Sequence, residues 1–332
     1  MPVNIGRREL IAALGGAATW PLTAHAQQSA MPVVGFIYGG SADGDARFAV
    51  AFRKGLNETN AVEGQNVIVE YHWLQGHYDR LPALMADLIN RRVAVIATPA
   101  SGPAALAAKA ATATIPIVFG VAEDPTHLGL VASLARPGGN ATGINFFSRE
   151  VVAKRLRLLH DLVPKAVRIA VLVNPTNTSS ARITLQEAQE AAPAIGLKFR
   201  YSTPRQSTRS MQPLPRLRAR PPPDALFVAG DGFFSSRRGQ FATLAARDRI
   251  PSAYSERDFA AVGGLMSYGT DLSEVFHQVG VYTGSILKGA KPADLPVLQS
   301  TKFEFVINLQ TARALGIEVP SGVLSIADEV VE

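Results

Sequence analysis

Short apolar runs rich in β-branched residues alternate with amphipathic stretches along most of this chain. The run Val33–Tyr38 precedes a stretch, 45–60, in which Phe48, Phe52 and Leu56 recur at helical spacing. In the first half, further strands are expected over 67–71, 93–97, 116–119 and 141–144, and further helices over 78–92, 103–113 and 124–135. Single helices between strands predict right-handed βαβ units, and therefore a doubly wound parallel sheet with helices on both faces.

The same alternation starts again in the second half. Strands are expected over 168–173, 197–201, 225–229, 252–254, 264–267 and 303–308, with helices over 151–163, 179–194, 237–249, 272–288 and 309–315. Two α/β halves predict an N-terminal lobe over 27–146, completed by a late crossover segment, and a C-terminal lobe over 147–332. The chain is expected to cross between the lobes near Asn145–Phe147. Because ligands bind beyond the carboxyl ends of parallel strands, we expect the binding site in the cleft between the lobes.

The first 26 residues have the pattern of an export signal. Arg7 and Arg8 precede a short apolar run, and Ala24-His25-Ala26 is a small-x-small cleavage pattern. The paired arginines favour the twin-arginine route, and a frayed N-terminal helix is the alternative. We therefore expect a soluble protein exported to the periplasm, and the absence of cysteine argues against a lipid anchor.

Composition and motifs argue against several other classes. The chain is 47% hydrophobic and 18% charged, which excludes a disordered chain, and it has no apolar stretch long enough for a membrane-spanning helix. It lacks a phosphate-binding loop, a G-x-S-x-G turn and an H-E-x-x-H pair. The sequence therefore predicts no catalytic residue, no metal site, no cofactor and no nucleic-acid partner. An exported enzyme that uses the same cleft remains the alternative.

The loops that follow the strands hold the candidate binding residues. Backbone amides at a helix start, next to Ser or Thr, suit a small carboxylate. Asp231, Glu256 or Asp124 could accept hydrogen bonds from an ammonium group, and an apolar body could lie between Phe233, Phe234, Tyr254 and Tyr268. The competing interpretation is that the polar residues are turn residues or helix caps and that the phenylalanines belong to the core.

Motifs over nearly the whole chain carry a family resemblance. They are Val34–Ile37, Phe52–Leu56, Val62–Val67, Tyr78–Pro82, Ile115–Phe119, Arg136–Asn140, Gly263–Gly269, Pro292–Pro296 and Lys302–Asn308. These segments resemble exported solute-binding proteins of ABC transporters, in the subfamily related to tryptophan- and phenylalanine-binding members. The resemblance implies the type I periplasmic-binding-protein fold, in which two Rossmann-like lobes are joined by a hinge.

The resemblance also implies a function and a set of contacts. The protein would be a periplasmic receptor for a small molecule, such as an amino acid or another small carboxylate, and would deliver it to an ABC transporter permease in the inner membrane. The implied ligand contacts are Ser41, Thr98, Ser101, Glu123 and Asp124 from one lobe, and Asn174, Asp231, Phe234, Tyr254 and Tyr268 from the other.

The segment 202–223 departs from the family pattern, which would place a crossover helix there. It holds six prolines and five arginines, a composition that is incompatible with a regular helix. A compensated frameshift in the gene would explain it, and so would a basic, polyproline-like surface loop. In either case the segment contributes much of the formal net charge of +6.

Overall fold

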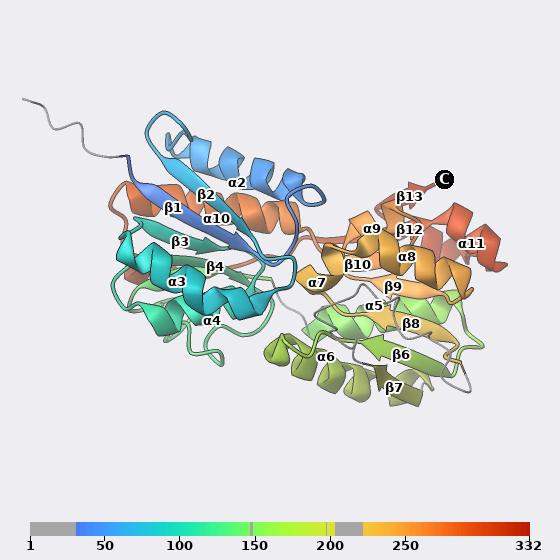
Figure 1. Ribbon diagram of the computed structural model, residues 1–332. Helices are drawn as coiled ribbons and strands as arrows, with labels where there is room; N and C mark the ends of the chain where they lie inside the picture. The colour runs from blue at the N-terminus through green and yellow to red at the C-terminus, as the bar shows by residue number, and fades with distance from the viewer. Residues whose placement is uncertain (1–30, 147–148, 197, 203–221) are drawn as a thin grey trace, which may run out of the picture. The chain divides into compact units, whose positions relative to one another are not determined.

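The computed structural model describes residues 31–146, 149–196, 198–202 and 222–332. The expected export signal over 1–26 and nearly all of the Pro/Arg-rich segment 202–223 lie outside these residues. Two β-sheets, each flanked by helices, make up the described chain (Figure 1). No helix of the described residues is both long enough and apolar enough to cross a membrane.

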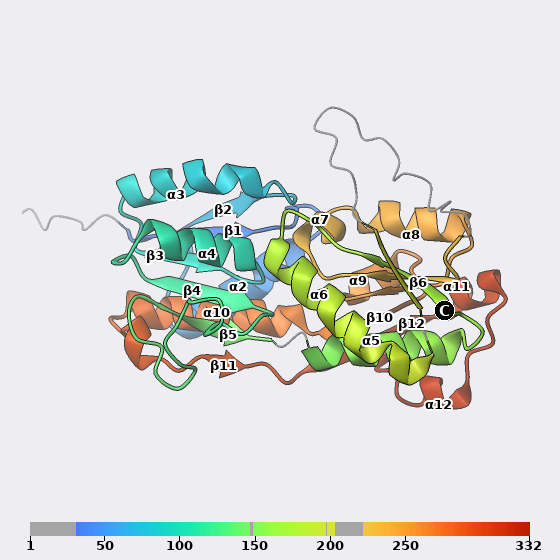
Figure 2. The ribbon, with the colours of Figure 1, turned by 90° about the horizontal axis from the view of Figure 1, so that it is seen from below.

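The first sheet has six parallel strands in the order β11-β5-β4-β3-β1-β2. They are β1 (Val33–Tyr38), β2 (Ile68–Trp73), β3 (Val95–Thr98), β4 (Ile117–Val121), β5 (Ala141–Asn145) and β11 (Leu298–Gln299). Helices α2 (Ala46–Glu58) and α10 (Leu272–Leu287) cover one face, and α3 (Leu81–Asn90) and α4 (Gly102–Ala111) cover the other (Figure 2). This sheet and its helices form the first lobe.

Strand β1 shows why both faces of this sheet are covered. Phe36 packs with Phe52 and Phe276 on the α2/α10 face, whereas Ile37 belongs to the cluster with Met85 on the α3/α4 face. Successive side chains of a strand point to opposite faces, so a continuous apolar run requires a helix layer on each side. The continuous apolar sequence of β1 therefore predicts its central, fully buried position.

The second sheet has seven strands in the order β13-β12-β10-β9-β8-β6-β7 and forms the second lobe. They are β6 (Arg168–Leu172), β7 (Lys198–Ser202), β8 (Ala225–Val228), β9 (Ser252–Tyr254), β10 (Met266–Thr270), β12 (Phe303–Asn308) and β13 (Glu329–Val331). Its helices are α5 (Arg149–Leu162), α6 (Thr178–Ala191), α7 (Gly232–Ser235), α8 (Arg238–Arg247), α9 (Arg257–Ala261), α11 (Leu309–Leu315) and α12 (Ser321–Leu324). Single 3₁₀ turns occur at Tyr78–Arg80, Pro193–Ile195 and Pro292–Asp294.

The chain passes between the two sheets three times: after β5, between β10 and α10, and between β11 and β12. Helix α10 and strand β11 come late in the sequence but pack against the first sheet. Both elements lie within 147–332, the range expected for the second lobe. The predicted α/β fold with two lobes is confirmed.

Three details of the predicted secondary structure and topology differ from the structure. The helix expected over 124–135 does not form, because the carboxylate of Asp124 accepts hydrogen bonds from the backbone nitrogen and the hydroxyl of Thr126, at 2.8 and 2.6 Å, and so stabilises a turn. Strand β12 runs antiparallel to β10, whereas a fully parallel second sheet was expected. The short strands β11 and β13 were not predicted.

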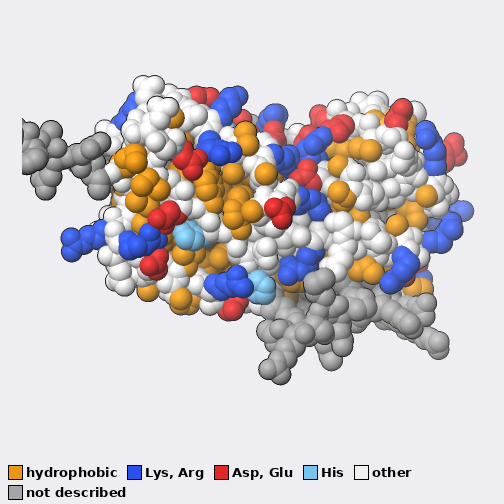
Figure 3. Space-filling model, turned by 45° about the horizontal axis from the view of Figure 1, so that its top comes forward, with side chains coloured by type: hydrophobic (Ala, Val, Ile, Leu, Met, Phe, Trp, Pro, Cys, Tyr) orange, Lys and Arg blue, Asp and Glu red, His pale blue; other side chains and the backbone are white. Residues whose placement is uncertain are grey.

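Acidic and basic side chains lie next to one another over the face that Figure 3 presents. Two ion pairs are consistent with this mixture: Arg91 contacts Glu70 at 2.7 Å, and Arg47 contacts Asp258 at 3.1 Å. An ion pair on the surface, such as Arg91–Glu70, contributes little to stability, so the packing of the sheets and helices dominates.

Helices α2 and α10 approach each other through glycines. A Cβ atom at Gly280 would lie 2.1 Å from the backbone oxygen of Phe52, and one at Gly55 would lie 2.0 Å from the backbone oxygen of His277. Backbone atoms cannot move aside as a flexible side chain can. The α2–α10 contact therefore depends on the absence of a side chain at both positions.

We expect Gly280→Ala to lower the free energy of unfolding by about 1–3 kcal/mol or more, because the added methyl group forces the two helices apart. Gly239→Ala is the matched control, since Gly239 lies in helix α8 and a Cβ atom added there would meet no neighbouring group within 4 Å. That substitution should stabilise the protein by about 0.5–1 kcal/mol through helix propensity. Urea unfolding of both variants checks the prediction, and equal stabilities would contradict it.

Candidate functional site

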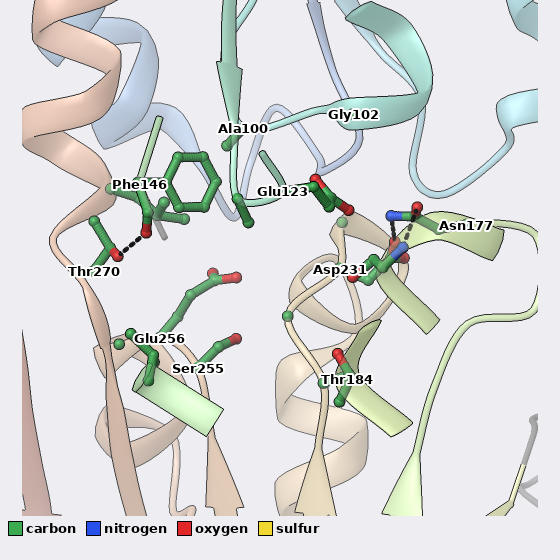
Figure 4. A pocket seen from close by; sticks show the side chains of 18 of the residues that line it. Ala100, Gly102, Glu123, Phe146, Asn177, Thr184, Asp231, Ser255, Glu256 and Thr270 are labelled. Carbon is green, nitrogen blue, oxygen red and sulfur yellow. Dashed lines mark hydrogen bonds between the residues drawn. The ribbon is translucent and has the colours of Figure 1, made fainter. Parts of the chain in front are cut away.

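A pocket lies where the loops that follow strands of both sheets come together (Figure 4). Its empty space is about 860 Å³, including solvent at the mouth. The first lobe contributes residues such as Tyr38, Glu123 and Phe146, and the second contributes residues such as Arg155 and Glu256. This is the strand-end position at which the sequence predicts a binding site.

Asp231 follows strand β8 and caps helix α7 at the second-lobe wall of the pocket. Its Oδ1 accepts hydrogen bonds from the Asn174 amide and the Phe233 backbone nitrogen, both at 2.8 Å. Its Oδ2 accepts from the Asn177 amide at 2.8 Å and from the hydroxyl of Tyr78, a first-lobe residue, at 3.2 Å. Burial raises the pKa of Asp231, while these donors stabilise its charged form.

Glu123 follows strand β4 and faces the pocket from the first lobe. Its side chain is buried, and no cation of the described residues forms an ion pair with it. Burial, with a smaller contribution from the negative charge of Asp231, raises the pKa of Glu123. Figure 4 shows Glu123 beside Asp231 and Asn177. Two buried carboxylates from different lobes therefore share one end of the pocket.

Glu256 follows strand β9 and is only 7% exposed to solvent. The hydroxyl of Ser235 donates a 2.6 Å hydrogen bond to Oε1, whereas the buried Oε2 has no hydrogen-bond partner among the described residues. Burial, followed by the charge of Asp45, raises the pKa of Glu256 to about 7. The carboxyl group therefore changes its protonation state near neutral pH.

Arg155 projects from helix α5 and is the one cation among the described residues that line the pocket. Its Nε donates to the backbone oxygen of Tyr268 at 2.6 Å, and its Nη1 donates to that of Val228 at 3.4 Å. The guanidinium carbon lies 5.0 Å from the centre of the Phe227 ring. Arg155 thus connects strands β8 and β10, and burial lowers its pKa to about 9.

The remaining lining includes apolar side chains from both lobes. They are contributed by Tyr38, Phe146, Val151, Val152 and Leu272 among others. Phe146 belongs to the first crossing segment, and its backbone oxygen accepts a 3.0 Å hydrogen bond from Thr270 of the second (Figure 4). The pocket can therefore enclose a partly apolar solute between polar ends.

Of the ten predicted contact residues, Glu123 and Asp231 line the pocket. Asn174 lies behind Asp231 and donates to it, so it orients the carboxylate. The structure also agrees with the alternative interpretation of Asp231 as a helix cap, because the carboxylate accepts from the backbone of Phe233. The two interpretations are compatible, since the same carboxylate caps α7 and faces the pocket.

The other seven predicted contacts lie outside the pocket lining. Phe234 and Tyr254 are fully buried in the second-lobe core, and for Phe234 this agrees with the alternative interpretation. Tyr268 stacks on Phe303, with ring centres 6.1 Å apart. Thr98 and Ser101 are buried at the end of β3, Ser41 donates its backbone nitrogen to Asp45, and Asp124 forms the exposed turn described above.

The lining residues that were absent from the predicted contacts include Tyr78, Phe146, Arg155 and Asn177. Asn177 lies in a strand-end loop, and Tyr78 and Phe146 lie in segments that the sequence singled out for other reasons. Arg155 lies on a helix, where no strand-end rule applies. A signal was present, because Arg155 is four residues from both Val151 and Leu159 and therefore shares the apolar face of α5.

No group of three or more His, Asp or Glu side chains in the described part of the chain is arranged to hold a metal ion. The carboxylates of the pocket accept hydrogen bonds or stand alone. The arrangement suits reversible binding of a solute with hydrogen-bond donors.

A second contact between the lobes lies beside the pocket. Arg238 of helix α8 donates to Asp45 Oδ1 at 3.0 Å and also to the backbone oxygen of Gly44. The Asp45 side chain is fully buried, and its Oδ2 accepts from the Ser41 backbone nitrogen at 2.8 Å. A buried carboxylate that loses its cation is destabilised strongly, so this ion pair favours the arrangement in which the lobes touch.

We expect Arg238→Ala to weaken solute binding about tenfold or more, because the variant leaves Asp45 buried and unpaired whenever the lobes close. Arg238 does not line the pocket, so no solute contact is lost. Arg247→Ala on the same helix, whose partner is the neighbouring Asp248, is the control and should bind normally. Titration calorimetry with the cognate solute checks this, and equal affinities would refute the role of Arg238.

Stability should depend on pH through Glu256. Its pKa rises from an ordinary 4.5 to about 7 on folding, so between these values the folded chain holds a proton that the unfolded chain has lost. Stability contributed by Glu256 therefore falls as pH rises through this window. Between about pH 5.5 and about pH 7.5, the melting temperature of the unchanged protein should decrease as the pH rises. The decrease for Glu256→Gln over the same range should be smaller by a few degrees. Identical decreases in calorimetric scans would contradict the assignment.

Comparison with known proteins places this chain in a family. The sequence model for ABC transporter substrate binding proteins matches residues 10–331. A curated tyrosine-binding protein of Clostridioides difficile (strain R20291) is 27% identical over 267 residues, 80% of this chain and 76% of that protein.

Two solved structures share the fold. A Streptococcus pneumonia ABC domain in complex with L-Trp is 24% identical, with a TM-score of 0.78 over 91% of this chain and 100% of that one. The ligand-free, open form of a substrate binding protein with adhesive properties from Clostridium difficile is 25% identical, with a TM-score of 0.61 over 91% and 99% of the two chains. The family match spans nearly the whole chain, and this protein therefore belongs to the ABC transporter substrate-binding proteins.

Proposed function

We propose that this protein is a periplasmic receptor that binds a free amino acid in the pocket between its lobes and delivers it to the permease of an ABC importer. The observation that carries the proposal is the pair of buried carboxylates, Glu123 and Asp231, at one end of the pocket. The family supports a small-molecule solute and a permease partner. The export signal expected over 1–26 supports the periplasmic location.

The carboxylate pair favours an ammonium group as its ligand. Glu123 and Asp231 come from different lobes, and each lacks an ion-pair partner among the described residues. Placing two such charges together without a cation is costly, and a bound ammonium group would offset that repulsion as it bridges the lobes. The solute would thereby favour the closed arrangement, since only that arrangement brings both carboxylates to it.

An amino acid fits better than a simple amine. The apolar lining around Phe146, Val151 and Val152 can enclose a side chain, and the curated relative is named for tyrosine. The proposal involves no catalytic step, because the family is named for substrate binding.

Glu123→Gln is the test of the ammonium site. The substitution keeps the shape and removes one charge, so amino-acid affinity should fall about ten- to a hundredfold, which corresponds to about 1.5–3 kcal/mol for a charge-assisted hydrogen bond. The solute-free protein should become equally or more stable, because the repulsion with Asp231 is removed. Titration calorimetry against the free amino acids and thermal scans without solute provide the two measurements.

Asp124→Asn is the matched control. It removes the same charge from the next residue, which lies outside the pocket lining, and should leave affinity unchanged. Unchanged affinity in Glu123→Gln would remove the ammonium group from this end of the pocket. Failure of every free amino acid to bind the unchanged protein would refute the proposed function itself.

A further inference from the structure

The carboxyl group of Glu256 presents an unused hydrogen-bond acceptor to the pocket. Ser235 holds Oε1 through its 2.6 Å hydrogen bond, which fixes the orientation of the group. Oε2 is buried without a partner among the described residues. Figure 4 shows Glu256 projecting into the pocket at a place separate from Glu123 and Asp231. A buried acceptor without a donor is unfavourable, so a donor from the solute would stabilise the complex.

The charge around Glu256 indicates what kind of donor fits. Arg155 lines the same second-lobe part of the pocket. Burial lowers the pKa of Arg155, and the negative charge of Glu256 offsets part of that decrease, so the two groups interact. The carboxylate of Asp45, which also acts on Glu256, is already paired with Arg238 at 3.0 Å. A cationic group beside Glu256 would meet the guanidinium of Arg155, and an anionic group would meet Glu256 itself. A neutral donor, a hydroxyl or an N–H group, avoids both repulsions.

The pocket that holds this acceptor and the ammonium end also has an apolar lining. Phe146, Val151 and Val152 are part of the same pocket surface as Glu256. A solute that uses both polar ends therefore needs an apolar body between its ammonium group and its donor. Aromatic amino acids with a hydroxyl or a ring N–H have this arrangement, and phenylalanine lacks the donor.

We propose that Glu256 is a specificity-determining residue that accepts a hydrogen bond from a neutral donor at the far end of an aromatic amino-acid side chain. The inference rests on the proposed function, because it takes a free amino acid as the solute. Sites that hydrogen-bond a solute hydroxyl discriminate strongly against the analogue without it, since the buried protein group is then left unpaired.

L-tyrosine and L-phenylalanine provide the test because they differ by one hydroxyl group. Titration calorimetry on the unchanged protein should give at least about tenfold tighter binding of tyrosine. Glu256→Met keeps the approximate volume and removes the acceptor. Its tyrosine affinity should fall while its phenylalanine affinity holds, so that the ratio drops below about threefold.

Glu304→Gln is the control, since Glu304 lies on β12 outside the pocket lining and pairs with Arg257; its ratio should be unchanged. If Glu256→Met does not fold, Ser235→Ala serves instead. It frees Oε1 and should lower the ratio by about threefold, and an unchanged ratio would count against the proposal.

The outcomes separate the two proposals. Equal affinities of the unchanged protein for the two amino acids would overturn the role of Glu256 and leave amino-acid binding intact. An equal loss of affinity for tyrosine and phenylalanine in Glu256→Met would also overturn the role of Glu256. Glu256 would then contact a group that the two amino acids share. Absence of binding for every free amino acid would refute the receptor function on which the inference rests.

Discussion

The site depends on burying three carboxylates with one guanidinium. Glu123, Asp231 and Glu256 line the same pocket, and Arg155 is the cation among the described lining residues. Burial of a charge is tolerated only when hydrogen bonds or an opposite charge stabilise it. The chain meets this requirement unevenly: Asp231 accepts four hydrogen bonds, whereas Glu256 keeps one oxygen without a partner. Because their hydrogen-bond partners differ in number, the three carboxylates can contribute differently to binding.

Part of this arrangement could be predicted from the sequence because it follows from strand ends. Continuous apolar runs such as β1 predict parallel strands covered on both faces, and carboxylates that follow such strands are brought to one edge, as Glu123 and Asp231 are. The same rule failed for Phe234 and Tyr254, because an aromatic residue after a strand can equally turn back into the core. Arg155 was missed because a helix brings it to the pocket, and the contacts that hold it are with backbone oxygens distant in sequence.

The topology of the second lobe was less predictable for a related reason. The residue pattern of β12 does not indicate whether the strand runs parallel or antiparallel to its neighbour. Its direction beside β10 depends on the path that the chain takes between them, through α10 and β11. On that path the chain returns to the first sheet and only then crosses to the second sheet, where β12 begins. Such a crossing depends on the path between elements, and the apolar periodicity within one element does not predict it.

The crossing segments also connect the hinge to the site. The side-chain amide of Asn145, at the end of β5, donates to the backbone oxygens of Val121 and Glu123 at 3.0 and 2.8 Å. The backbone oxygen of Asn145 accepts from the Ser300 nitrogen at 2.9 Å, which joins the first crossing segment to the third. The residue that begins one crossing thus fixes the loop carrying Glu123. A rotation of the lobes about these crossings would therefore be passed on to the loop that carries Glu123.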